Sequence, residues 1–130
     1  MKILLAEDDY VTRKAMDSFL SKYGECDVTV DGMEAVDAFL LALEEGEPYD
    51  LVCLDIMMPV MDGYQALMGS RNLEKERNIP KEQEAKVIMT TALNDEKNVK
   101  MAFDLGCTVY SGKPIDQDRF EQVLKKFGLI

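Results

Sequence analysis

Carboxylates follow two apolar runs of this sequence. Glu7 and Asp8 come directly after the run Lys2–Ala6, and Asp55 closes the run Leu51–Asp55. An ionised carboxylate among apolar residues is costly unless a cation or hydrogen-bond donors neutralise it. Oxygen ligands suit Mg²⁺, which commonly binds carboxylates, waters and a phosphate oxygen together. If the two runs are neighbouring strands, these acids predict a Mg²⁺ site that also holds a phosphoryl group.

A threonine and a lysine at the ends of two further apolar runs belong to the same hypothesis. Thr91 lies near the end of "KVIMTTA" (86–92), and Lys113 follows "CTVYS" (107–111). Three carboxylates, one ammonium group and one divalent cation carry no net charge together, so such a pocket can accept a phosphoryl group. Taken singly, an acid after a strand is usually a turn or capping residue, and a threonine in a strand is commonplace. The prediction depends on all of them meeting in one place.

Five apolar runs alternate with five helical patterns along the chain. The expected strands are 2–6, 26–30, 51–55, 86–92 and 107–111, and the expected helices are 10–24, 31–46, 61–78, 94–106 and 116–128. In the first helix Val11, Ala15, Phe19 and Tyr23 recur every four residues, which predicts its buried face. Gly24 suits the end of that helix.

Capping residues mark the beginnings of three of these helices. Asp31, Asp62 and Asn94 are the expected N-caps, because their side chains accept hydrogen bonds from the first free backbone N–H groups. The charged stretch 72–86 predicts a solvated helix end and loop. No internal repeat or linker interrupts the pattern, so we expect one domain over residues 1–130.

The alternation of strands and helices predicts an α/β fold, with a parallel sheet covered by helices on both faces. The first, third and fourth strands are continuously apolar, as central strands are, and the second and fifth alternate, as edge strands do. This favours the flavodoxin-like, doubly wound (βα)5 sheet with strand order 2-1-3-4-5. Ligands bind such a sheet where its winding reverses, here between strands one and three. Glu7, Asp8 and Asp55 end these two strands.

Composition argues against several classes of function. A net charge of −10 disfavours direct binding of DNA or RNA, which requires Lys and Arg at the phosphates. The apolar runs are too short for a membrane helix or for a signal peptide. The absence of histidine removes Ser-His-Asp and Cys-His catalysis and histidine-ligated metals. Cys26, Cys53 and Cys107 are widely spaced, which indicates reduced thiols in a cytoplasmic protein.

Four motifs resemble the receiver domains of two-component response regulators, the CheY-like family. They are "ILLAEDD", "LDIMMPVMDG", "VIMTTA" and "YSGKP", in the family's order and spacing. The resemblance extends from Met1 to Ile130 and implies a stand-alone single receiver domain with no output domain. It also implies that the protein is not an enzyme, beyond catalysing its own phosphorylation and dephosphorylation.

This resemblance assigns a chemical role to each residue of the predicted site. Asp55 resembles the aspartate that accepts the phosphoryl group. Glu7 and Asp8 resemble the acidic pair that binds Mg²⁺ together with Asp55, and the backbone carbonyl of Met57 resembles a further metal ligand. Lys113 resembles the cationic contact of the phosphoryl group.

The resemblance also implies a switch. Thr91 resembles the hydroxyl residue that hydrogen-bonds the phosphoryl group, and Tyr110 resembles the aromatic residue that turns inward when that hydroxyl moves. The Lys113–Pro114 peptide bond resembles one that is usually cis in the family. The implied change alters the face made by the fourth helix, the fifth strand and the last helix, where a downstream protein binds.

The implied partners are proteins. A histidine kinase or a histidine phosphotransfer protein is the expected phosphodonor, because this chain has no histidine. The downstream protein stays unidentified, and a monomer or a weak phosphorylation-dependent dimer is expected, with no membrane contact.

Two alternatives stay open at this point. One is a receiver-like binding module that works without phosphorylation. The other is a Mg²⁺-dependent phosphatase of the haloacid dehalogenase type, which is disfavoured because that family needs a second aspartate where this chain has Met57. A flavodoxin-like FMN carrier fails because "AEDDYVT" is acidic and repels phosphate.

Overall fold

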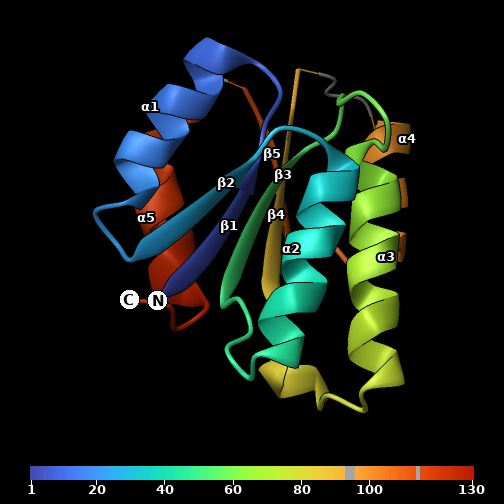
Figure 1. The fold of residues 1–130 in the computed structure, drawn as a ribbon. Helices are drawn as coiled ribbons and strands as arrows, with labels where there is room; N and C mark the ends of the chain where they lie inside the picture. Colours follow the sequence, from blue (N-terminus) through green and yellow to red (C-terminus); the bar gives the residue numbers. More distant parts are fainter. Residues whose placement is uncertain (93–95, 114) are drawn as a thin grey trace.

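Five apolar segments form the parallel strands of one sheet (Figure 1). The structure is a computed structural model that describes residues 1–92, 96–113 and 115–130, with 96 and 97 described by their backbone alone. The strands are β1 (Lys2–Ala6), β2 (Glu25–Thr29), β3 (Leu51–Asp55), β4 (Lys86–Thr91) and β5 (Val109–Gly112). Their order is β2-β1-β3-β4-β5, so the predicted α/β class and strand order are confirmed.

Helices follow each strand along the chain. They are α1 (Tyr10–Leu20), α2 (Gly32–Glu44), α3 (Gly63–Glu76), α4 (Glu96–Asp104) and α5 (Gln117–Lys126), with a 3-10 helix η1 (Lys81–Gln83) before β4. The predicted caps Asp31 and Asp62 accept backbone N–H groups at 2.9 Å, which fixes where α2 and α3 begin. The expected cap Asn94 and the proline of the expected Lys113–Pro114 cis bond lie outside the described residues.

Each face of the sheet packs against its own layer of helices. α1 and α5 cover one face, and α2, α3 and α4 cover the other (Figure 1). Successive residues of β1 belong to different layers, because side chains alternate across a strand. Ile3 packs under α1 and α5, whereas Leu4 packs under the opposite helices. This two-sided burial explains why the central strands are continuously apolar.

The buried face of α1 differs from the prediction. Met16, Phe19 and Leu20 are buried, whereas Val11 is 73% exposed and Ala15 is exposed. Residues four apart advance by about 40° around a helix at each step, so a strict four-residue spacing drifts away from any one face. The core takes residues at spacings of three and four instead.

Gly24 has a different role from the predicted one. α1 ends at Leu20, and a side chain at Gly24 would collide with the carbonyl oxygen of Met1. Glu25 donates its backbone N–H to that same carbonyl at 3.0 Å. Gly24 is therefore required where β2 comes alongside the beginning of the chain.

The charged stretch 72–86 contains a buried acid, which the sequence did not indicate. Glu74 is 1% exposed and accepts hydrogen bonds from the Arg71 guanidinium at 2.7 Å and from the Ala85 backbone N–H at 2.8 Å. Arg71 also donates to the carbonyl of Gly106. A buried charge is tolerated only when it is paired and hydrogen-bonded in this way. The pair ties α3 to the segments that precede β4 and β5.

The cysteines are packing residues. Cys53 and Cys107 are buried, Cys26 is half-buried, and all three are free thiols. Burial raises the pKa of Cys26 to about 12 and that of Cys107 to about 11, so both stay protonated at neutral pH. In the described part of the chain, no helix combines the length and apolar character that crossing a bilayer requires.

Candidate functional site

Three carboxylates converge beyond the carboxyl ends of β1 and β3. The two strands are direct neighbours, with Ala6 opposite Leu54, so the acids that follow them lie at the same edge of the sheet. Glu7, Asp8 and Asp55 each place a carboxylate oxygen within 4.8 Å of the others. The predicted acidic cluster is therefore present at the point where the winding of the sheet reverses.

Lys113 links these acids across the sheet. It follows β5, and its ammonium group lies 2.6 Å from Glu7 Oε1 and 3.2 Å from Asp55 Oδ1. Burial alone would lower the pKa of Lys113, but the hydrogen bond to Glu7 and the charge of Asp55 outweigh burial and raise it. Lys113 is thus held as a cation beside Asp55, as predicted.

Glu7 is the most constrained acid of the cluster. It is 2% exposed, and its Oε2 is buried without a hydrogen-bond partner. Burial, followed by the contact with Asp55, raises the pKa of Glu7 to about 8, against its ordinary value of 4.5, although Lys113 acts in the opposite direction. A buried carboxylate oxygen without a donor is the group that a divalent cation satisfies, so the donor set fits Mg²⁺.

Asp8 and Asp9 have separate roles. Asp8 is exposed as a residue. Partial desolvation of its carboxylate, followed by the nearby Asp55, still raises its pKa, as expected for a member of a carboxylate cluster. Asp9 turns away from the cluster and caps α1, where it accepts the Thr12 backbone N–H at 2.9 Å and the Thr12 hydroxyl at 2.6 Å. These hydrogen bonds lower the pKa of Asp9. The structure therefore gives the two adjacent acids different roles.

Arg13 supports the loop that carries the acids. Its guanidinium donates to the backbone carbonyls of Glu7 and Asp8 at 3.0 and 3.2 Å. The sequence interpretation did not single out Arg13. The sequence does contain a signal for this role. Arg13 lies six residues after Glu7, on the first turn of the helix that follows the acids.

Thr91 and Lys113 are joined through the backbone. Thr91 is fully buried at the end of β4, next to the strand that carries Asp55. Its carbonyl accepts the Lys113 backbone N–H at 2.9 Å. This hydrogen bond ties the end of β4 to the residue that follows β5.

Tyr110 and Met57 are the two other residues of the predicted site. Tyr110, on β5, is half-buried and packs against the core under α2, α3 and α4. Met57 follows Asp55 by two residues and is 63% exposed.

The loop after Asp55 is tightly turned and fixed at both ends. The Met61 N–H donates to the carbonyl of Pro59 at 2.7 Å, which closes a three-residue turn centred on Val60, whose φ is +68°. Gly63, at the start of α3, is required because a side chain there would collide with the carbonyl oxygen of Asp55. Gly32 of α2 donates to the Met61 carbonyl at 3.0 Å and holds the middle of the loop.

Replacing Val60 by asparagine will raise the stability of the protein. A β-branched residue with positive φ costs on the order of 1–3 kcal/mol, and the side chain of Val60 is 75% exposed, so little packing offsets that strain. Asparagine tolerates positive φ, and we expect Val60→Asn to increase the free energy of unfolding by about 1 kcal/mol in urea titrations. Val30→Asn is the matched control, since Val30 is also exposed but has ordinary φ. Equal effects of both substitutions would contradict this reading.

Comparison with known proteins shows which protein family with this strand order the chain resembles. The response regulator receiver domain family matches residues 3–125. The chain belongs to this family. The receiver-domain resemblance of the four motifs is therefore confirmed.

Curated relatives of this receiver domain differ in how much further sequence they carry. The chemotaxis protein CheY of Treponema pallidum is 35% identical, over 95% of this chain and 83% of that protein. The probable transcriptional regulator ycf29 of Porphyra purpurea is 32% identical over 95% of this chain, and hybrid signal transduction histidine kinase L of Dictyostelium discoideum is 30% identical over 98%. The chain spans 54% and 7% of the length of these two proteins.

Solved receiver structures share the fold along nearly the whole chain. The CheX–CheY–BeF3–Mg²⁺ complex of Borrelia burgdorferi contains a chain with 30% identity and a TM-score of 0.82, covering 98% of this chain and 89% of that one. The receiver domain of the sensor histidine kinase PA1611 of Pseudomonas aeruginosa PAO1, with magnesium coordinated in its active-site cleft, has 25% identity and a TM-score of 0.77, covering 97% and 94%.

Proposed function

We propose that residues 1–130 act as one response-regulator receiver, which takes a phosphoryl group onto Asp55 with Mg²⁺ bound. The observation that supports this most strongly is the position of Asp55. It ends a central strand, is 5% exposed, and lies beside two acids and a lysine ammonium group 3.2 Å away. Such a carboxylate is a nucleophile with its neutralising groups already placed.

The proposed reaction requires little movement of the protein. A carboxylate oxygen of Asp55 attacks phosphorus, and the phosphorus–nitrogen bond of a phosphohistidine donor breaks. Lys113 balances charge on the phosphoryl oxygens, because its ammonium group already contacts Asp55. Glu7, Asp8, Asp55 and the backbone carbonyl of Met57 would hold Mg²⁺, which supplies further positive charge when it is bound.

The proposed output is a two-state change of the α4–β5–α5 face. Thr91 hydrogen-bonds the phosphoryl group, and its displacement opens space for Tyr110 to turn inward. A downstream protein then binds this face.

The donor is a histidine kinase or a histidine phosphotransfer protein, and the receiver itself binds neither DNA nor membrane. We propose a cytoplasmic monomer, or a weak dimer formed on phosphorylation, that acts on no separate substrate.

Treatment with acetyl phosphate and Mg²⁺ tests the proposal. Intact-mass spectrometry is expected to show one phosphoryl group per chain, and borohydride reduction followed by peptide mapping is expected to place it on Asp55. A chain that stays unmodified under conditions that label another receiver domain would favour the phosphorylation-independent binding module instead.

Beryllofluoride, a phosphoryl mimic, will change the α4–β5–α5 face. We expect the amide NMR signals around Asp55 to shift. We also expect shifts in the parts of that face that the structure describes, largest around Tyr110. Thr91→Ala is expected to keep the shifts around Asp55 and to lose those at Tyr110, because the connecting hydroxyl is gone. Shifts confined to α2 in the unmodified protein would contradict the proposed switch.

A further inference from the structure

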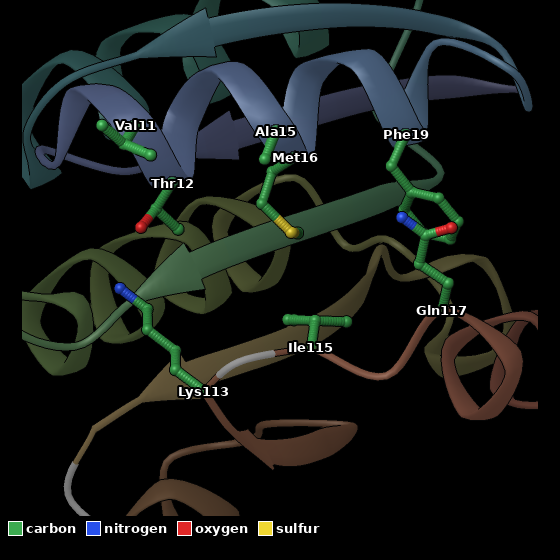
Figure 2. Close-up of a pocket in the computed structure, with 8 residues that line it drawn as sticks. All are labelled: Val11, Thr12, Ala15, Met16, Phe19, Lys113, Ile115 and Gln117. Atoms are coloured by element: carbon green, nitrogen blue, oxygen red, sulfur yellow. The ribbon is translucent and has the colours of Figure 1, made fainter.

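The first turn of α1 lies beside the acidic cluster. Figure 2 shows Thr12, from this turn, at the same end of a pocket as the Lys113 ammonium group. That ammonium group lies 2.6 Å from Glu7 Oε1. Asp9, just before the turn, accepts the Thr12 backbone N–H at 2.9 Å. The beginning of this helix and the edge of the predicted Mg²⁺ site are therefore in direct contact.

Arg13 reaches from this turn back to the loop that carries the acids. One nitrogen of its guanidinium, Nη1, donates to the backbone carbonyls of Glu7 and Asp8 at 3.0 and 3.2 Å. The guanidinium carbon lies 5.5 Å from the centre of the Tyr10 ring, so a cation–π contact also restrains the group. Arg13 is half-buried, and these contacts fix where its charge lies.

The position of Arg13 is unfavourable in one respect. A cation in the first turn of a helix opposes the helix dipole, whose positive end lies there. The two hydrogen bonds to carbonyl groups offset this cost, because hydrogen bonds from a charged donor are stronger than neutral ones. Both carbonyl groups belong to proposed metal ligands. The contacts of Arg13 therefore point to a role in the site and not in the helix.

Asp8 depends most on this contact. Glu7 is 2% exposed and donates its backbone N–H to the Thr29 carbonyl at 3.1 Å, so packing fixes it independently. Asp9 is fixed by its cap on α1. Asp8 lies between them and is exposed, so packing contributes little to its position. The Arg13 hydrogen bond to its carbonyl sets the backbone from which the Asp8 carboxylate reaches the cluster.

We infer that Arg13 is a positioning residue for Mg²⁺, which holds the backbone of Glu7 and Asp8 so that both carboxylates meet the ion. The inference rests on the proposed function and adds to it a residue that acts through the acids.

Positioning and electrostatics predict opposite effects of removing Arg13. Loss of a nearby positive charge by itself strengthens the binding of a cation, because Coulomb repulsion falls. Loss of the two hydrogen bonds weakens binding, because the ion must then order the loop itself. The direction of the change in Mg²⁺ affinity therefore distinguishes the two roles.

An NMR titration of the metal-free protein with Mg²⁺ measures this direction. The amide signals of Asp8 and its neighbours report the dissociation constant, at about 0.15 M salt, where exposed charges are screened. We expect Arg13→Gln to raise the Mg²⁺ dissociation constant by about tenfold.

Lys14→Gln is the matched control. It removes the same charge from the next residue, which is exposed and whose ammonium group lies 5.7 Å from the centre of the Tyr10 ring. We expect this variant to bind Mg²⁺ as tightly as the unmodified protein or slightly more tightly. An Arg13→Gln variant that binds Mg²⁺ at least as tightly as Lys14→Gln would overturn the inference.

The Mg²⁺ dependence of phosphorylation separates positioning from a general loss of structure. With acetyl phosphate, Arg13→Gln is expected to need about tenfold more Mg²⁺ for half-maximal labelling and to approach the normal rate at saturating Mg²⁺. Arg13→Lys keeps the charge without the planar fork, so its Mg²⁺ requirement is expected to lie between those of the unmodified protein and Arg13→Gln.

The remaining outcomes distinguish this inference from the proposed function. If Asp55 is labelled and Arg13→Gln has an unchanged Mg²⁺ requirement, Arg13 does not position the site and the proposed function stands. A lower labelling rate of Arg13→Gln at every Mg²⁺ concentration, with unchanged Mg²⁺ affinity, would likewise contradict metal positioning. Amide signals around Asp8 that do not respond to Mg²⁺ in the unmodified protein would overturn both.

Discussion

Asp55→Asn will abolish phosphorylation by acetyl phosphate, with a loss of at least about 100-fold in the rate of labelling. The amide has nearly the shape of the carboxylate, so the fold and the mouth of the site stay as they are. It is a far poorer nucleophile, and it removes one of the negative charges of the proposed Mg²⁺ site. Neither Glu7 nor Asp8 can replace it, because neither ends β3 beside the Thr90–Thr91 end of β4.

Matched controls separate the role of Asp55 from a general effect of removing acids. Asp9→Asn lowers the negative charge of the same region by the same amount, and asparagine caps a helix about as well as aspartate. Asp9 turns away from the cluster to cap α1, so we expect near-normal labelling of this variant. EDTA is expected to suppress labelling of the unmodified protein. Full labelling of Asp55→Asn, detected by intact-mass spectrometry, would falsify the assignment of the phosphoacceptor.

The stability of the metal-free protein will fall as the pH rises from 6 to 8, and Glu7 will be the main cause. The folded protein raises the pKa of Glu7 from 4.5 to about 8, chiefly through burial. Between these two values the folded state binds a proton that the unfolded state has released. Stability from this group is therefore complete below pH 4.5 and is lost as the pH passes through about 8. One proton contributes at most about 1.4 kcal/mol per pH unit to this slope.

Mg²⁺ is expected to reverse the trend. Binding requires the ionised carboxylate, so the stabilisation that Mg²⁺ confers grows toward pH 8 by mass action. Urea unfolding at pH 6, 7 and 8, with EDTA or with Mg²⁺, measures both effects. The chain has no histidine, and burial keeps Cys26 and Cys107 protonated in this range, so few other groups titrate there.

Glu7→Gln separates the contribution of Glu7 from that of Asp8. Glutamine does not titrate, so the metal-free variant is expected to lose most of the pH slope and to be more stable than the unmodified protein at pH 8. Its response to Mg²⁺ is expected to weaken by at least about tenfold in affinity. Asp8, whose pKa is also raised, is unchanged in this variant. A metal-free protein that becomes more stable from pH 6 to pH 8 would contradict the raised pKa of Glu7.

Local sequence patterns determined most of the fold, because the apolar pattern of each strand shows whether one or both of its faces are buried. The continuous apolar runs of β1, β3 and β4 can be satisfied only between two layers of helices, and the alternating runs only at the edges. That information was enough to order the strands, and the order in turn brought Glu7 and Asp55 together. Asp31 and Asp62 predicted where α2 and α3 begin, since a cap acts within three residues of itself.

The outline of the site followed from the strand order, but its electrostatics did not. Lys113 contacts Glu7 across 106 residues of sequence, and that meeting depends on β5 lying at the edge of the same sheet. The sequence supplied the charges and their balance. It did not show that Glu7 is almost fully buried while Asp8 is exposed, and this difference is what raises the pKa of Glu7 so far.

Tertiary packing alone decided the remaining features. The face that α1 buries depends on how the helix rotates against the sheet, which is why Met16 and Leu20 are inside and Val11 is left exposed. Glu74 is buried because Arg71 and Ala85, from different segments, supply its hydrogen bonds. Val60 keeps a strained φ because the loop is fixed on both sides of it. Periodicity and capping act over a few neighbouring residues and are therefore visible in the sequence, whereas each of these contacts forms only when separate elements meet.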